Sequence, residues 1–141
     1  MNGRYAEPQD ADTVLSVGQW HHVAGVFDGS EVRTYVDGQL VAQGAAQGAR
    51  TMRQLPLIIG ADVDGAGNAD SPFDGLIDAV RVSTIPRYEG DSFIPSRRWQ
   101  ADGDTALLLN FDGLVGPLAY DESDSQAHAR SFGDVELQPI R

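Results

Sequence analysis

Three aspartates and one asparagine lie close together in the stretch from residue 62 to residue 70, which reads DVDGAGNAD. The side chains of Asp62, Asp64, Asn68 and Asp70 offer oxygen ligands, and Ca²⁺ takes about six to eight oxygens. The pattern does not match an EF-hand loop, which a glutamate closes at its end. The residue types therefore make this stretch a candidate calcium site, and they are also typical of a solvated flexible turn.

Aromatic and basic side chains gather in a second stretch that reads as a loop. Trp99 follows Arg97 and Arg98, and Tyr88 stands slightly upstream beside Arg87. Tryptophan, tyrosine and arginine are the side chains that most often anchor a bound partner. Trp99, Tyr88 and Arg97 are accordingly predicted to contact a ligand, although such aromatic residues also pack over the ends of a sandwich.

The sequence offers little for catalysis. His21 and His22 are adjacent, so on a strand they face opposite sides and cannot easily ligate one metal ion. His22 is expected to be a packed or hydrogen-bonded residue. The five glutamates are scattered, and no G-x-S-x-G nucleophile motif occurs. Glycoside hydrolysis needs two carboxylates that flank the scissile bond, so a hydrolase is a minor alternative and no catalytic residue is predicted.

Charge and composition exclude several classes of partner and kinds of site. The chain has 141 residues with a formal net charge of -11, which argues against nucleic acid and against anionic lipid as partners. It has no cysteine, so disulfides and thiolate zinc sites are excluded. No apolar run is long enough to span a membrane, and no signal-peptide segment is visible.

Apolar alternation and turn residues predict an all-β fold. Asp37-Gly38 between two alternating runs is a strong hairpin signal, since both positions of a type I′ turn have positive φ. No segment has a sustained helical period, which favours an antiparallel β-sandwich or jelly roll. The expected strands are Trp20–Phe27, Glu31–Val36, Gln39–Gln43, Leu55–Gly60, Phe73–Ser83, Thr105–Phe111 and Val135–Gln138.

The order of short motifs resembles that of one family. The motifs are WHHVA from residue 20, FDGS from residue 27, YVDG from residue 35, IIG from residue 58 and FDGLIDAVRVS from residue 73. Together they are similar to the laminin-G-like, pentraxin-like concanavalin-A superfamily. The resemblance implies a concanavalin-A-like jelly roll and an extracellular or cell-surface binding and adhesion module for glycan or protein, with calcium as a candidate cofactor.

The chain departs from that pattern at its start, because only 19 residues precede Trp20. The expected organisation is a polar arm over 1–19, the carboxy-terminal part of a sandwich over 14–104, and a tail over 105–141. The tail resembles the family's opening strand. It is expected either to close the same sandwich or to begin a second domain, and a partner chain could instead complete the sheet. A structural subunit of an oligomeric or filamentous assembly is therefore the alternative function.

Overall fold

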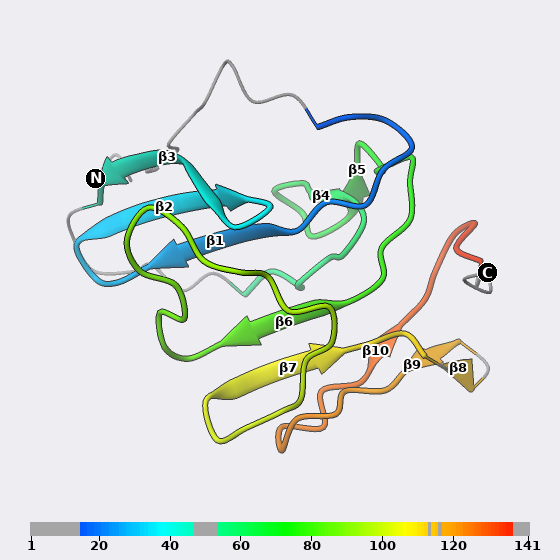
Figure 1. Cartoon of the computed structure of the whole chain (residues 1–141). Coiled ribbons are helices and arrows are strands. Elements are labelled where there is room, and N and C mark those ends of the chain that lie inside the picture. The colour runs from blue at the N-terminus through cyan, green and yellow to red at the C-terminus, as the bar shows by residue number, and fades with distance from the viewer. Residues whose placement is uncertain (1–14, 47–53, 113, 116, 137–141) are drawn as a thin grey trace.

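The computed structural model describes residues 15–46, 54–112, 114–115 and 117–136, in which short strands are joined by loops (Figure 1). The strands are β1 (Val23–Phe27), β2 (Glu31–Val36), β3 (Gln39–Ala45), β4 (Asp62–Val63), β5 (Ala69–Asp70), β6 (Val80–Ser83), β7 (Thr105–Leu109), β8 (Leu114–Val115), β9 (Leu118–Ala119) and β10 (Ala129–Arg130). All strand pairs are antiparallel, and none of the described residues is helical. The predicted antiparallel all-β class is confirmed.

Strands β1, β2 and β3 form a meander in which a tight turn joins β2 to β3. Asp37 and Gly38 both have positive φ, 50° and 80°, so the predicted turn is confirmed. The Asp37 carboxylate accepts a hydrogen bond from the backbone N–H of His22 at 2.8 Å and also bonds the Nδ1 of His21 at 2.7 Å. The turn therefore holds the chain that enters β1.

Strand β7 is the most buried element and pairs with β6. Leu107, Leu108 and Leu109 are all buried. The tail closes the outer edge of β7, because the Asp121 carboxylate accepts from the Leu108 N–H at 2.8 Å and the Glu122 N–H donates to the Leu108 oxygen at 2.9 Å. The tail thus contributes a strand and an edge cover to the sheet that begins with β6.

A small apolar core lies between β7 and the short sheet β10-β9-β8. Leu107, Leu109 and Ala119 form this cluster, and Ile59 and Phe111 pack against it. Strands β4 and β5 form a separate two-stranded hairpin. The sequence did not predict β4, β5, β8 or β9, which are all two residues long and carry no alternation that a pattern could reveal.

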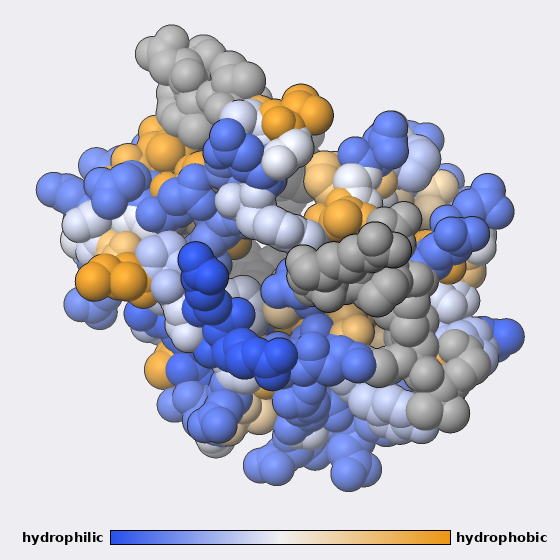
Figure 2. Space-filling model, turned by 45° about the vertical axis from the view of Figure 1, so that its right-hand side comes forward, coloured by the Kyte–Doolittle hydropathy of each residue, from blue (hydrophilic) through white to orange (hydrophobic). Residues whose placement is uncertain are grey.

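In the described part of the chain the strands form four small sheets, and the sandwich is open. Apolar residues consequently reach the surface. Figure 2 shows them in several separate places among hydrophilic residues. The expected strand Trp20–Phe27 starts at Trp20, but Trp20 is 56% exposed and β1 begins only at Val23. That expectation was wrong because, within the described residues, no second layer covers this side chain.

Two further strand predictions, Leu55–Gly60 and Phe73–Ser83, require correction. The segment Leu55–Gly60 is not a strand, and Leu57 is 67% exposed. The segment Phe73–Ser83 is a strand only from Val80. A single backbone bond links the two segments, from the Phe73 N–H to the Gly60 oxygen at 2.8 Å. Among the described residues, neither Leu55–Gly60 nor the part of the second segment before Val80 therefore has a ladder partner.

The last predicted strand, Val135–Gln138, is wrong for its two described residues. Val135 and Glu136 lie outside any strand, and residues from 137 onward lie outside the described residues. Among the described residues the last strand is instead β10, which bonds β9. The division of the chain into 1–19, 14–104 and 105–141 stays a prediction.

Candidate functional site

An open groove of about 570 Å³ lies between β1 and β6. Its walls include every residue of β1, and Arg81 to Thr84 at the end of β6. Successive side chains of a strand point to opposite faces, so only the edge of a strand can present consecutive residues to one cavity. The groove therefore lies between two strand edges, and β1 and β6 do not pair with each other.

The outer edge of β1 carries backbone groups that β2 does not use. The Asp28 N–H donates to the Glu31 oxygen, and the Asp37 N–H donates to the His22 oxygen. In the register of β1 and β2, the even-numbered residues from His22 to Asp28 are therefore the ones hydrogen-bonded to β2. In an antiparallel ladder bonded and non-bonded residues alternate. The N–H and C=O groups of the odd-numbered β1 residues therefore point into the groove.

Strand β6 also has an edge whose backbone groups point toward the groove. On β7, the N–H and C=O of Leu108 bond the tail, so they point away from β6. Arg81 faces Leu108 in the register. Because this pair is not hydrogen-bonded, the backbone N–H and C=O of Arg81 point toward the groove. Among the described residues, no backbone bond joins β1 or β6 to a third strand on this side.

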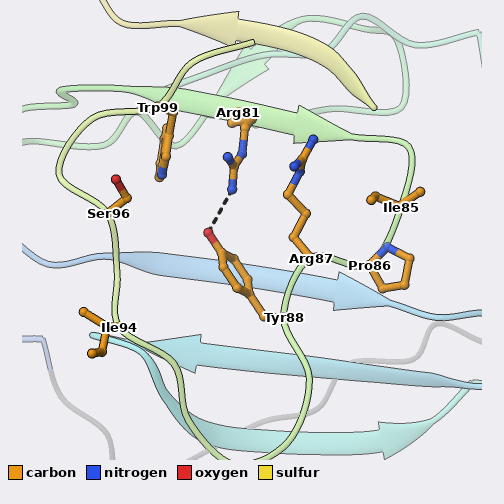
Figure 3. A pocket seen from close by; sticks show the side chains of 8 residues that line it. All are labelled: Arg81, Ile85, Pro86, Arg87, Tyr88, Ile94, Ser96 and Trp99. Carbon is orange, nitrogen blue, oxygen red and sulfur yellow. Dashed lines mark hydrogen bonds between the residues drawn. The ribbon is translucent and has the colours of Figure 1, made fainter. Parts of the chain in front are cut away.

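The groove contains a charged side chain, Arg81, that has no carboxylate partner in the part of the chain that the structure describes. Arg81 donates a hydrogen bond to the Tyr88 hydroxyl at 2.9 Å, and its guanidinium lies 4.9 Å from the centre of the Trp99 ring. Figure 3 shows these three side chains together, with Arg81 from β6 and the other two from the segment that connects β6 to β7. In the ion pairs of the described residues no acid binds Arg81.

The other charged residues of the groove leave Arg81 as its unneutralised arginine in the described residues. Arg87 also lines the groove, but Asp102 binds it in a two-pronged pair, with one bond of 2.8 Å. That hydrogen bond raises the pKa of Arg87 and holds the pKa of Asp102 well below its usual range. No aspartate or glutamate is among the described residues that line the groove, in a chain whose net charge is -11.

An aromatic cluster adjoins the groove, and three of its members, His22, Tyr88 and Trp99, line it. The His22 ring meets the rings of Tyr88, Phe93 and Trp99 edge-on at 5.9, 5.5 and 5.7 Å. Tyr88 and Phe93 are stacked at 3.6 Å, and the buried Tyr35 donates its hydroxyl to the Gly90 oxygen at 2.9 Å. This cluster fixes the connecting segment over the meander.

Two polar atoms of the cluster are buried without a hydrogen-bond partner in the described residues, namely His22 Nδ1 and Trp99 Nε1. Burial lowers the pKa of His22, and the nearby Arg81 charge lowers it further. His22 is therefore neutral near pH 7. The expectation that it is a packed residue agrees with its contacts.

The predicted ligand residues separate into two groups. Trp99 and Tyr88 both line the groove, whereas Arg97 is exposed and does not. Sequence reasoning missed Arg81, although a signal was present: it is the one charged residue in the apolar run from Ala79 to Val82.

The predicted calcium ligands lie in the β4–β5 hairpin. Asp62 and Asp70 face each other in the register. The Asp64 carboxylate accepts bonds from the N–H groups of Ala66 and Asn68, both at 2.8 Å, and these contacts, led by Asn68, lower its pKa. Within the described ranges, no group of three His, Cys, Asp or Glu side chains could hold a metal ion. Calcium binding stays a prediction, and the turn itself accounts for Asp64.

The antiparallel strands, with no helix among the described residues, and the order of the motifs are consistent with a concanavalin A-like fold. The chain belongs to the concanavalin A-like lectin/glucanases superfamily, whose laminin-G-like family model matches residues 1–90. No curated protein and no solved structure matched the chain. In the part of the chain that the structure describes, no helix is long and apolar enough to cross a membrane.

Proposed function

We propose that the chain is a non-catalytic binding module, acting outside the cell, that holds a negatively charged group of its ligand in the groove between β1 and β6. The observation that carries this proposal is Arg81, a cation stacked on Trp99 that no acid neutralises among the described residues. A guanidinium in such a setting binds a carboxylate through two parallel hydrogen bonds.

Electrostatics supports the choice of this groove over other surfaces. The protein as a whole repels anions, with a net charge of -11. An anionic ligand is therefore favoured at this recess, because its described lining contains arginines and no acid. The adjoining Trp99 face adds a flat apolar contact, which suits a sugar ring or a peptide side chain.

The same lining gives no support for hydrolysis. A glycosidase needs one carboxyl group as acid and a second as base or nucleophile, about 5 to 9.5 Å apart. The described groove residues include neither. Superfamily membership allows many functions on one fold, so the binding role rests on the groove.

Calorimetric titration tests the proposal. The probes are trigalacturonic acid and hexaglutamate as anions, and maltotriose as the neutral match, each in EDTA and again in CaCl₂. We expect Arg81→Gln to weaken anion binding by at least about tenfold, because a desolvated charge pair is lost. The matched control Arg130→Gln changes an exposed arginine of β10 and should stay within about twofold.

Equal binding of the anions by wild type and Arg81→Gln would contradict the proposal, as would the absence of any binding. Thermal unfolding of both variants checks that the fold is kept. A dependence on CaCl₂ would give the β4–β5 hairpin a role that the groove alone does not have.

A further inference from the structure

We propose that the ligand in this groove is an extended polypeptide strand from a partner protein, added between β1 and β6, in which acidic residues alternate with apolar ones. This inference rests on the proposed function for its location. It goes further by assigning the class of ligand and the way in which its backbone and side chains are read.

The backbone supports a strand rather than a compact ligand. Val23, Gly25 and Phe27 direct their N–H and C=O groups into the groove from one side, and Arg81 does so from the other. The arrowheads of β1 and β6 point the same way in Figure 1. A single strand that is antiparallel to one of them is therefore antiparallel to both, and can bond both edges at once.

The side chains divide into two faces that match an alternating strand. On the face covered by the connecting segment lie His22 and Arg81, which both contact Trp99. On the opposite, open face lie Val23, Phe27 and Val82, which are 57%, 42% and 39% exposed and also line the groove. An inserted strand would place acids beside Arg81 on the covered face and apolar side chains beside the valines and phenylalanine.

A single inserted strand can hydrogen-bond both β1 and β6 and still place its side chains on the matching faces. The β1 residues that offer backbone bonds, such as Val23 and Phe27, carry their side chains on the open face. On β6, Arg81 offers backbone bonds and carries its side chain on the covered face. In one strand, residues that bond opposite neighbours also point to opposite faces. An acid that bonds the backbone of Arg81 therefore lies directly opposite its guanidinium.

The test uses a synthetic peptide and the protein labelled for NMR. The probe is a seven-residue peptide of alternating valine and glutamate, with blocked ends. One control replaces glutamate by lysine, and a second keeps glutamate but methylates its backbone nitrogens. We expect both controls to bind at least about tenfold more weakly, the first through charge and the second through lost strand bonds.

Amide hydrogen exchange reports where the peptide lies. The amides of Val23, Gly25, Phe27 and Arg81 should slow at least about tenfold when the glutamate peptide is added. The amides of Ala24 and Val26 serve as internal controls, because they already bond β2 and should change little.

The outcomes separate this inference from the proposed function. If trigalacturonic acid binds through Arg81 but the glutamate peptide does not slow these amides, the strand is wrong and the anion site stands. If neither probe affects the groove, both proposals fail. If the amides are slow only at high protein concentration without peptide, and sedimentation shows a dimer, a second copy fills the groove and a distinct partner is wrong.

Discussion

Removing the Asp121 carboxylate should be among the most damaging single changes to this fold. The residue is buried, and its two oxygens accept five hydrogen bonds from residues of β7 and the tail. Through them the tail covers the outer edge of β7. Burial alone would raise the pKa of Asp121, but bonds from the Leu108 N–H and the Ser125 hydroxyl outweigh it and hold the pKa well below its usual range.

The cost of Asp121→Ala follows from which donors lose their partner. The hydroxyls of Ser123 and Ser125 can still donate to the Ala106 oxygen, at 3.2 and 2.7 Å. The backbone N–H groups of Leu108 and Ser123 are buried and would be left unpaired, at roughly 1 to 3 kcal/mol each. The expected loss is about 3 to 4 kcal/mol. Asp121→Asn keeps one acceptor for both donors and should cost about 1 kcal/mol.

Urea denaturation followed by circular dichroism measures these losses, and Asp124→Ala, an exposed neighbour, is the matched control. A loss below about 1 kcal/mol for Asp121→Ala would refute the reasoning. The pH dependence adds a check of sign. Because folding depresses the pKa of Asp121, its contribution is present above the unfolded value of about 4 and disappears as pH falls. The gap between wild type and Asp121→Asn should therefore narrow below about pH 4.

Two further predictions concern the turn after β2. Gly38→Ala should destabilise the fold by more than about 3 kcal/mol, since its Cβ would stand 2.0 Å from the Phe93 oxygen. Gly90→Ala, with positive φ but open space, should cost only about 1 kcal/mol, and similar losses in thermal unfolding would count against the contact. In NMR titration His21 should have a pKa above its ordinary value, because Asp37 bonds it, and Asp37→Asn should lower that pKa. An unchanged pKa would rule out the pair.

The meander could be predicted from the sequence because its information is local. Alternation over Glu31–Val36 and the turn residues Asp37 and Gly38 specify the strand and the hairpin without help from distant residues. The match of the family model to residues 1–90 confirms the resemblance that the motif order implied.

The segments Leu55–Gly60 and Phe73–Ser83 were predicted less well, because their strand character depends on a neighbour. An apolar run becomes a strand only where another edge accepts its ladder bonds. The short strand β6 forms because β7 provides that edge. Periodicity alone contains no information about which distant segment will do so.

The aromatic residues of the candidate site could be predicted from the sequence, whereas its arginine could not. Residue type identified Trp99 and Tyr88, but the same reasoning chose Arg97, which lies away from the groove. Arg81 is distinguished by the pairing of β6 and by the absence of an acid near its side chain in the described residues. Both properties arise only when distant segments come together.

The central claim is that β1 and β6 present unpaired edges to one groove. Amide hydrogen exchange along β1, on the protein without any ligand, tests it most directly. We expect an alternating profile, in which the amides of Ala24 and Val26 exchange slowly while those of Val23, Gly25 and Phe27 exchange fast. Slow exchange at all five positions would mean that the outer edge of β1 is already paired, and would contradict the claim.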